Sequence, residues 1–417
     1  MRAVVKRDPG EVSSSRVTSV SESGRRMLAD LMSAARLYVP DDLGGLLAQR
    51  GAALGADNVT VYLVDQEQYL LVPLPAPGVA PPAPVSIEAT LAGRCFRQLA
   101  QVESNDGREV WVPLLDGLER LGVMQLEFPD SGSRAEGGLL HAFAAAVAEI
   151  VVAKDPYGDL FTLVRRREPM SLAGEITWNL MPPLTFGTER AVVSCVLAPA
   201  YNVGGDTFDY AFDATTARVA LFDAMGHGLH AGLLATVAIA SYRQARRTGL
   251  NLVATVASVD AAVADAFAGE QFVTALLAEL DLATGRLTWH SAGHPFPLLL
   301  RDTRVVKTLE SDPGLPLGLA AALGTAPRVE HEVLQRGDRL LLYSDGVVEA
   351  RDSDGDFFGV DRLGDLVSRE SAAGQPAPET MRRLMHAILD HQEGTLQDDA
   401  TTMLLEWKSG GEQRITP

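Results

Sequence analysis

Cysteine is almost absent from this sequence. Its 417 residues include two cysteines, Cys95 and Cys195, which lie far apart and have neither a second cysteine nor a histidine nearby. Such isolated residues do not provide a disulfide framework or the ligand spacing of a zinc site. Both are therefore predicted to be small core residues, and zinc or redox chemistry is set aside.

Long apolar runs are also missing. The first 27 residues contain Ser13-Ser-Ser15 and several charges but no apolar segment of the kind found in signal peptides. The most apolar stretch, Phe143 to Ala153, is interrupted by Glu149 and is too short to span a bilayer. The sequence therefore predicts a cytoplasmic protein without membrane segments.

Positive charge is scarce. Lysine and arginine together number 36 against 54 aspartates and glutamates, which gives a net charge of -18. A surface of this sign repels a phosphate backbone, and no arginine-rich stripe offsets it, so no nucleic-acid partner is expected. The same acidity suits a protein that gathers several carboxylates around cations.

The remaining composition is that of a folded protein, with 47% hydrophobic and 22% charged residues. A chain of this length predicts two domains with connecting segments. Composition and periodicity divide it into a flexible arm (1–27), an α+β domain (28–155), a helical connector (156–183), a second α+β domain (184–407) and a tail (408–417). In the second domain, apolar β runs alternate with helical patterns at Leu229 to Arg247, Leu252 to Phe267 and Glu379 to Gln392.

The first α+β domain resembles a GAF domain. The resemblance rests on the segments Leu54-Gly-Ala56, Val110-Trp-Val-Pro-Leu114 and Leu121-Gly-Val-Met124, within an order of helix, strands, helix, strands and helix. Members of that family bind cyclic nucleotides, haem or small metabolites, or bind nothing. The resemblance thus implies a sensory domain whose ligand is unknown, and a ligand-free dimerisation module remains equally open.

In the connector, Leu172, Ala173, Ile176 and Leu180 fall on one face of a helix. This stripe has two interpretations. It packs against its own domain, or it pairs with a second chain and carries a signal from the sensory domain. A homodimer is the expected assembly.

Four aspartates in the second domain share one local design. Asp206, Asp223, Asp345 and Asp398 each lie at the end of an apolar strand or in a tight turn next to one, and Asp206 and Asp345 directly adjoin a glycine. A buried carboxylate is costly unless it is paired or binds a cation, and glycine lets a ligand approach the backbone closely. Each aspartate alone fits an ordinary turn. Their joint occurrence predicts a site for hard cations such as Mg²⁺ or Mn²⁺, which prefer oxygen ligands.

Residues 184–407 resemble the catalytic domain of the SpoIIE/RsbU branch of the PPM metal-dependent protein phosphatases. The matching segments, in family order, are Val203-Gly-Gly-Asp206, Asp223-Ala-Met-Gly-His-Gly228, Phe272-Val-Thr-Ala275, Ser291-Ala-Gly-His-Pro295, Pro313-Gly-Leu-Pro-Leu-Gly318, Gly337-Asp-Arg-Leu-Leu-Leu-Tyr-Ser-Asp-Gly346 with Glu349-Ala350, and Asp398-Asp-Ala-Thr401. The resemblance implies an αββα sandwich that binds two Mn²⁺ or Mg²⁺ ions. It also implies hydrolysis of phosphoserine or phosphothreonine on a protein, such as a STAS-type anti-sigma-factor antagonist.

The resemblance assigns a role to each matched residue. Asp206, Asp223, Asp345 and Asp398 match the metal-ligating carboxylates; Asp223 matches the one that bridges both ions, and the backbone carbonyl of Ala224 matches a further ligand. The residues predicted to support the site are Gly205, Asp209, Gly226, His227, His294, Gly346 and Asp399. Asp209 and Asp399 are expected to act through hydrogen bonds or an additional, weaker cation, and His227 through a hydrogen bond beside the metals. For His294 a structural role and a substrate contact stay equally open.

Some positions depart from the family pattern. Thr207-Phe208 replaces the usual aromatic pair, Phe222 stands where glycine is frequent, and Met225 where serine is frequent. None of these changes removes a ligand. The alternative function is a signal-sensing scaffold with a catalytically weak phosphatase-like domain. A two-metal nuclease is disfavoured by the negative charge, and an anti-sigma kinase by the lack of a glycine-rich ATP-binding motif.

Overall fold

The computed structural model describes residues 20–130, 132, 137–202, 204–312, 314–321, 323–394 and 396–408. Most of the predicted flexible arm and of the tail lies outside these residues. Within the arm, however, helix α1 (Glu22–Ala35) begins at residue 22, where Ser21 caps it by accepting a hydrogen bond from the Gly24 amide. The last residues of the predicted arm are therefore helical, which corrects that boundary.

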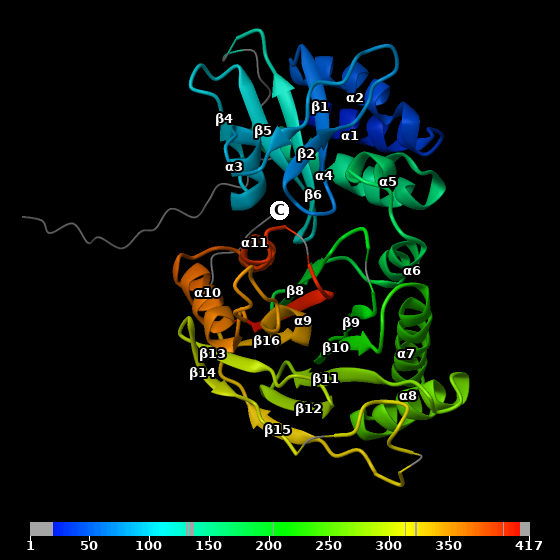
Figure 1. Cartoon of the computed structure of the whole chain (residues 1–417). Coiled ribbons are helices and arrows are strands. Elements are labelled where there is room, and N and C mark those ends of the chain that lie inside the picture. Colours follow the sequence, from blue (N-terminus) through cyan, green and yellow to red (C-terminus); the bar gives the residue numbers. More distant parts are fainter. Residues whose placement is uncertain are drawn as a thin grey trace, which may run out of the picture.

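The N-terminal domain is built on one antiparallel six-stranded sheet with the order β3-β2-β1-β6-β5-β4 (Figure 1). The strands are β1 (Asn58–Val64), β2 (Leu70–Pro73), β3 (Val85–Ser86), β4 (Val102–Glu103), β5 (Glu109–Asp116) and β6 (Glu119–Glu127). Alternate residues of β1 face opposite sides, as the period of a strand requires. Val59, Val61 and Leu63 point into one hydrophobic core, and Tyr62 and Val64 into another.

Helices cover both faces of this sheet. The larger core is closed by α1 together with α2 (Leu43–Gly51), α4 (Gly137–Lys154) and α5 (Leu160–Arg165), and the smaller core by α3 (Leu91–Gln98). Cys95 of α3 is fully buried in the smaller core, as predicted for a small apolar residue. The arrangement is a separate α+β unit. Its assignment as a GAF domain stays a prediction.

The connector ends in α6 (Leu172–Leu180), which packs on the first long helix of the second domain. Its buried residues are Ala173, Gly174 and Thr177, whereas Leu172 is 61% exposed. The buried face of α6 thus differs from the predicted apolar stripe, because small residues of α6 allow a close approach to the neighbouring helix. This contact favours packing within the chain for most of the helix and leaves the predicted homodimer untested.

The C-terminal domain contains two antiparallel sheets packed face to face. One has five strands in the order β15-β12-β11-β10-β9, and the other has six in the order β14-β13-β16-β17-β8-β7. Their bounds are β7 (Thr185–Gly187), β8 (Ala191–Ala198), β9 (Asp206–Phe212), β10 (Thr216–Ala224), β11 (Val273–Asp281), β12 (Arg286–Ala292), β13 (Leu298–Arg301), β14 (Arg304–Thr308), β15 (Glu330–Val333), β16 (Arg339–Tyr343) and β17 (Ala400–Trp407).

Three hydrophobic layers hold this domain together. The inner faces of the two sheets enclose one core, which includes Phe208, Trp289 and Cys195. The five-stranded sheet is covered on its outer face by α7 (Leu229–Arg247) and α8 (Leu252–Ala266), and the six-stranded sheet by α10 (Val360–Ala372) and α11 (Ala377–His391). The short α9 (Asp345–Val348) follows β16. The domain is therefore the predicted αββα sandwich.

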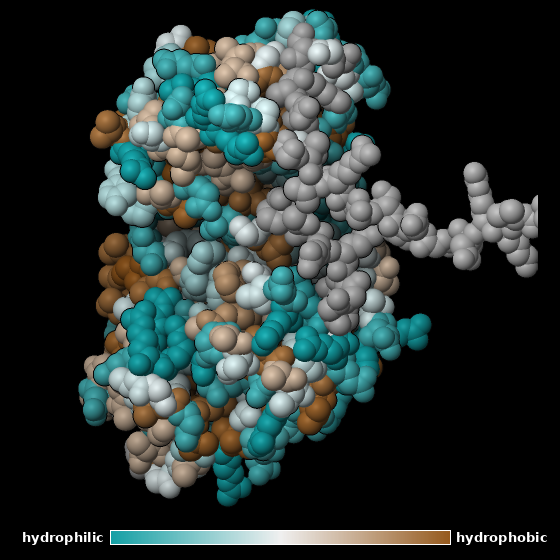
Figure 2. Space-filling model, turned by 180° about the vertical axis from the view of Figure 1, so that it is seen from behind, coloured by the Kyte–Doolittle hydropathy of each residue, from teal (hydrophilic) through white to brown (hydrophobic). Residues whose placement is uncertain are grey.

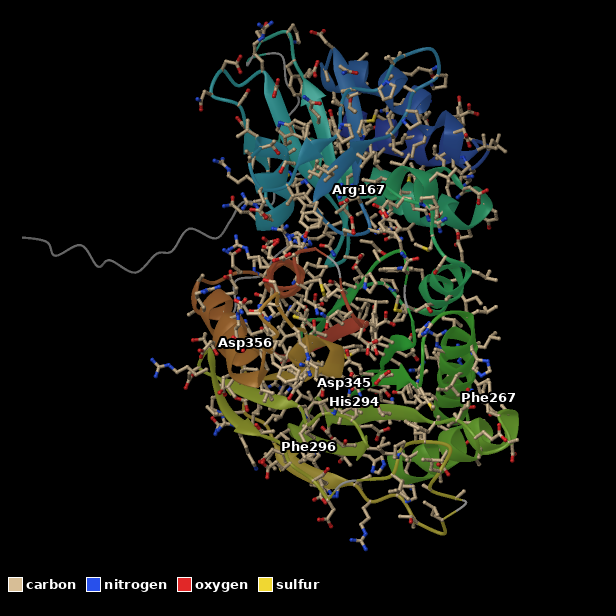
Figure 3. The ribbon with its side chains drawn as sticks, viewed as in Figure 1. Arg167, Phe267, His294, Phe296, Asp345 and Asp356 are labelled. Atoms are coloured by element: carbon tan, nitrogen blue, oxygen red, sulfur yellow. The ribbon has the colours of Figure 1, made fainter. Side chains whose placement is uncertain are left out.

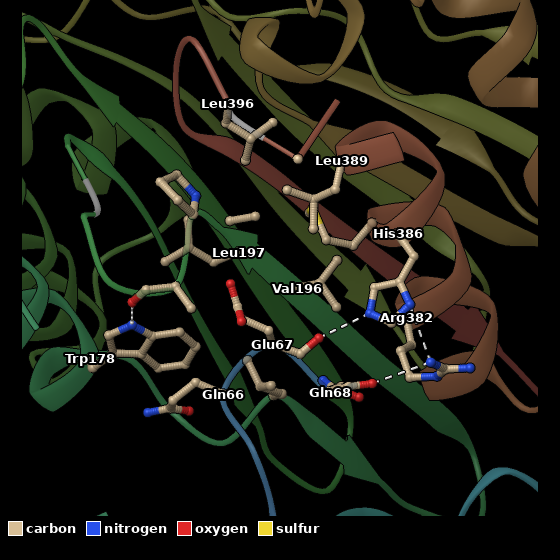
Figure 4. Close-up of a pocket in the computed structure, with 16 residues that line it drawn as sticks. Gln66, Glu67, Gln68, Trp178, Val196, Leu197, Arg382, His386, Leu389 and Leu396 are labelled. Carbon is tan, nitrogen blue, oxygen red and sulfur yellow. Dashed lines mark hydrogen bonds between the residues drawn. The ribbon is translucent and has the colours of Figure 1, made fainter. Parts of the chain in front are cut away.

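The two domains meet at α11, which faces the N-terminal sheet in Figure 1. The space-filling view in Figure 2 shows them as an upper and a lower lobe with a narrower waist between them. His386 of α11 stacks on Tyr69 with ring centroids 3.9 Å apart, and it contacts the carbonyl of Glu67 at 2.9 Å. A cavity of about 60 Å³ lies at this boundary, between residues 66–68, Trp178, β8 and α11 (Figure 4).

Among the described residues, no helix combines the length and the apolar character needed to cross a bilayer.

Candidate active site

Three strands of the five-stranded sheet bring polar side chains together at one edge. Asp206, the first residue of β9, lies directly opposite Asp223 near the end of β10. On its other side, Asp223 lies opposite Thr274 of β11. Directly opposed residues of antiparallel strands project from the same face of a sheet. The register therefore places these three side chains in one row.

The six-stranded sheet contributes the other carboxylates. Asp345 is the first residue of α9, directly after Ser344 at the end of β16, and Asp398 and Asp399 precede β17, which pairs with β16. The two segments touch: a Cβ atom on Gly346 would lie 2.0 Å from the carbonyl oxygen of Asp399. Glycine is thus required beside Asp345 for this approach. Figure 3 shows Asp345 in the lower domain, next to His294 in that view.

The carboxylates act on one another electrostatically. Burial, followed by the charges of Asp345 and Asp398, raises the pKa of Asp223 from its ordinary value near 4 to about 7. Burial, followed by the charges of Asp223 and Asp399, raises the pKa of Asp206 well above its ordinary value. The pKa of Asp345 is raised by burial and then by Asp398 and Glu349. Asp206, Asp223, Asp345 and Asp398 are thus connected by charge repulsion, and their role as metal ligands stays a prediction.

The donor atoms suit a hard divalent cation. Asp206 is 2% exposed, and its Oδ2 atom is buried without a hydrogen-bond partner among the described residues. A buried carboxylate oxygen without a hydrogen-bond partner is costly, and a bound cation would supply the missing partner. Within the described part of the chain, however, no three Asp, Glu, His or Cys side chains converge closely enough to form a ready metal site. The residues fit the cation in their chemistry, and their side chains would have to move closer together to bind it.

Asp399 supports the start of β9. Its Oδ2 atom accepts hydrogen bonds from the backbone amides of Gly204, Gly205 and Asp206, at 2.5, 2.7 and 3.1 Å. Asp398, by contrast, is exposed, and its Oδ1 atom accepts from the Asp399 amide at 2.9 Å. Of the two neighbouring aspartates, Asp399 therefore fixes the backbone while Asp398 keeps a carboxylate available to a ligand.

Asp209 forms hydrogen bonds, one of the two roles predicted for it, but it does so on the face of β9 away from Asp206. It lies three residues after Asp206 and therefore on the opposite face of β9. There it forms ion pairs with Arg243 and Arg246 of α7, both at 2.9 Å. Asp209 thus attaches α7 to the sheet.

The two histidines lie in different surroundings. His227 is exposed in the turn after β10, and its predicted hydrogen bond beside the metals stays a prediction. His294 is 4% exposed, and its Nδ1 atom lies 2.9 Å from the hydroxyl of Thr274. Because His294 is buried, it does not reach a bound protein, and of the two roles left open the structural one remains.

Glycines shape the backbone around the carboxylates. A Cβ atom on Gly205 would lie 2.2 Å from the carbonyl oxygen of Ala224, and the Ala224 amide donates to the Gly205 carbonyl at 3.2 Å. The Ala224 carbonyl thus faces the start of β9, beside Asp206. Gly226 has φ +89°, a conformation that favours glycine in the turn leading to α7.

Sequence reasoning missed one functional side chain. Thr274 donates a hydrogen bond from its hydroxyl to Oδ2 of Asp223 at 3.2 Å. The segment Phe272-Val-Thr-Ala275 was recognisable as a motif, but the strand register that sets Thr274 opposite Asp223 is not visible in a single sequence.

The two stacked sheets with helices on both outer faces agree with the phosphatase domain that the motifs predicted. Residues 213–408 match the family model described as Stage II sporulation protein E (SpoIIE). The C-terminal part of the chain is thus a SpoIIE-type phosphatase domain, as its motifs predicted.

Curated relatives share this part of the chain. The phosphoserine phosphatase RsbU of Bacillus subtilis is 24% identical over 243 residues, which are 58% of this chain and 71% of RsbU. The phosphoserine phosphatase RsbP of the same organism is 26% identical over 197 residues, or 45% of this chain and 47% of RsbP. The chain thus spans less than half the length of RsbP.

Among solved structures, the PP2C domain of SiaA from Pseudomonas aeruginosa is 21% identical, with a TM-score of 0.48. The match covers 57% of this chain and 94% of that domain.

Proposed function

We propose that this protein is a metal-dependent protein serine/threonine phosphatase. The observation that carries the proposal is the charge repulsion that connects Asp206 and Asp223 of one sheet with Asp345 and Asp398 beside the other sheet. The relatives named as phosphoserine phosphatases support the same activity.

The carboxylates of Asp206, Asp223, Asp345 and Asp398, with the carbonyl of Ala224, would hold two Mn²⁺ or Mg²⁺ ions. Bound ions of this kind supply an activated water and neutralise charge on a phosphoryl group. In the chain itself, Asp399 fixes the backbone before Asp206 through three amide hydrogen bonds. The exposure of Asp398 leaves the cluster open to a phosphorylated side chain from outside.

The proposed substrate is a phosphorylated STAS-type anti-sigma-factor antagonist in a partner-switching pathway. The matches to RsbU and RsbP, both named phosphoserine phosphatases, support a phosphoserine-containing substrate. The proposal further includes a cytoplasmic location, a homodimer, and an N-terminal GAF-like domain that senses a signal. Contacts between that domain and α11 offer a physical route for regulation.

A direct test uses the full chain with Mn²⁺ and p-nitrophenyl phosphate, and then each phosphorylated STAS protein of the source organism. We expect hydrolysis that depends on the metal and is abolished by chelator or by Asp223→Ala. The matched control is Asp365→Ala, which removes an exposed aspartate on α10. Activity that persists in Asp223→Ala, or in chelator, would contradict the two-metal proposal.

A second candidate function is a sensory scaffold with weak catalysis. It is favoured by one observation: within the described residues, no three potential ligand side chains form a ready metal site. Calorimetric titration with Mn²⁺ separates the two candidates. The phosphatase should take up metal, and the scaffold should give no binding heat.

A further inference from the structure

A short chain of polar contacts runs from Asp223 into the interior of the domain. Thr274 of β11 donates its hydroxyl proton to Oδ2 of Asp223, with 3.2 Å between the oxygens. Behind Thr274, the Nδ1 atom of His294 lies 2.9 Å from the same hydroxyl oxygen. Thr274 therefore bridges an exposed edge of the carboxylate cluster and a buried imidazole.

The direction of this chain depends on which ring nitrogen of His294 carries the proton. A threonine hydroxyl has one proton, so when it donates to Asp223 it has to accept from Nδ1–H of His294. Burial lowers the pKa of His294 to about 3, against a smaller opposing effect of the Tyr343 backbone, so the ring is neutral and carries one proton. The alternative tautomer, protonated on Nε2 towards Tyr343, would draw the Thr274 proton away from Asp223.

The imidazole is held rigidly. The hydroxyl of Ser291 donates to the His294 carbonyl at 2.6 Å and accepts from the His294 amide at 3.2 Å. Between them, Gly293 has φ +71°, and a Cβ atom there would lie 2.9 Å from the Pro316 ring. Both features lock the turn that carries His294, so the position of its Nδ1 atom is set by the fold.

We propose that His294 and Thr274 are a positioning pair for Asp223. The pair holds the Oδ2 atom of the carboxylate towards β11 and presents the other oxygen to the cation site. The inference rests on the proposed metal-dependent function. In it, His294 orients Asp223 through Thr274 in addition to packing in the core. Partners behind a metal ligand orient it, and their loss typically weakens metal binding by about 10- to 100-fold.

The test makes two measurements on the full chain. Calorimetry gives the Mn²⁺ affinity, and thermal unfolding in chelator gives the stability of the metal-free protein. Thr274→Val keeps the shape of the side chain but removes the hydroxyl, and we expect about 10-fold or weaker Mn²⁺ affinity with little change of the melting temperature in chelator. Thr274→Ser, which restores the hydroxyl, should bind as the parent chain does. A purely structural role of Thr274 would not produce this difference.

His294 is tested through the same measurement. His294→Leu should weaken Mn²⁺ binding, and His294→Asn, whose side-chain amide can take the place of the Nδ1–H donor, should recover part of it. In the double variant Thr274→Val/His294→Leu the loss should not exceed that of the stronger single change, because both act through one hydrogen bond to Asp223.

The protein contains a matched control pair. On the surface of β12 and β15, the hydroxyl of Thr288 lies 3.0 Å from Nδ1 of His331. Thr288→Val removes the same kind of contact away from the carboxylates and should leave Mn²⁺ affinity unchanged. Parent-like affinity in Thr274→Val, or fully additive losses in the double variant, would overturn the positioning role. A parent chain that binds no Mn²⁺ would instead overturn the proposed function and this inference together.

Discussion

The guanidinium of Arg120 in β6 donates a hydrogen bond to the carboxylate of Glu379 in α11 across the domain boundary, at 2.9 Å. Both side chains are buried, at 4% and 0% exposure. Glu379 also accepts from Arg382 and Arg383 of its own helix. Burial raises the pKa of Glu379, but the hydrogen bond and charge of Arg382 and then Arg120 outweigh it, and the pKa falls to about 2. Glu379 thus binds three guanidinium groups at the contact between the two domains, and Glu88 and Glu370 supply further negative charge to Arg382 and Arg383.

Substitutions in this cluster should differ in cost. Glu379→Gln leaves the buried guanidinium groups of Arg120 and Arg382 without their shared counter-charge, and breaking a buried pair in this way costs about 3–5 kcal/mol. Arg120→Met leaves Glu379 paired with two arginines, so a loss of about 1–3 kcal/mol is expected. Urea denaturation of the full chain measures both.

The control for this comparison is Arg26→Met. Arg26 pairs with Glu22 on the surface of α1, where both side chains are more than 70% exposed, and such pairs contribute less than about 1 kcal/mol. If Arg120→Met costs as much as Glu379→Gln, the carboxylate is not the centre of the cluster.

The metal-free protein should lose stability as pH rises. The pKa of Asp223 is about 7 in the folded chain and near 4 when unfolded, so between these values the folded state holds the proton that the unfolded state releases. Across this window the free energy of unfolding in chelator should fall by at least about 1 kcal/mol through this group. Thermal unfolding from pH 4 to 8 measures it.

Asp223→Asn isolates that contribution because asparagine does not ionise. In chelator at pH 8 the variant should be more stable than the parent chain, and the two should converge towards pH 4. Saturating Mn²⁺ should reverse the order at pH 8, since only the parent chain presents the charged ligand. If the parent chain is more stable than Asp223→Asn in chelator at pH 8, the carboxylates do not destabilise the metal-free protein by repulsion.

The neighbouring residues Asp398 and Asp399 should respond oppositely to substitution. Asp399→Ala removes the acceptor for three backbone amides, and leaving even one buried amide unpaired costs about 1–3 kcal/mol. Asp398→Ala removes an exposed side chain and should change stability by less than about 0.5 kcal/mol, yet abolish phosphatase activity. Chemical denaturation and the phosphatase assay distinguish the pair, and equal stability losses would contradict these roles.

Gly205 should tolerate no side chain. In Gly205→Ala the new Cβ atom would lie 2.2 Å from the Ala224 carbonyl oxygen, so β9 and β10 have to separate beside Asp206 and Asp223. A loss of about 1–3 kcal/mol and a strong decrease in activity are expected. Gly249→Ala is the control: its φ of +79° strains the backbone of an alanine, but no atom lies near the new Cβ atom and the residue follows α7, away from the aspartates. Activity should survive there.

Much of the catalytic domain was predictable because its signals are local. Apolar runs and helical periodicity gave the helices at Leu229–Arg247 and Leu252–Ala266 nearly to the residue. Aspartates at strand ends next to glycine indicated the cluster. Asp209 could have been excluded from it on the same basis, since three residues of strand separate it from Asp206 and turn it to the other face.

Other features depend on register and packing, which a single sequence does not display. Thr274 reaches Asp223 because β10 and β11 pair in one particular register. The three amides bound by Asp399 lie almost two hundred residues earlier in the chain, and Arg120 and Glu379 are 259 residues apart. Connecting such groups requires the folded sheets and the domain contact.

The sequence by itself determined the class of domain and predicted the carboxylates of its metal site, because both depend on short segments of neighbouring residues. The tertiary structure alone decided which face each supporting residue occupies. It directs Asp399 to the backbone before Asp206, Asp209 to the arginines of α7, and His294 to Thr274. The physical reason is that a hydrogen bond forms over about 3 Å, and only the packed sheets bring groups from distant strands within that distance.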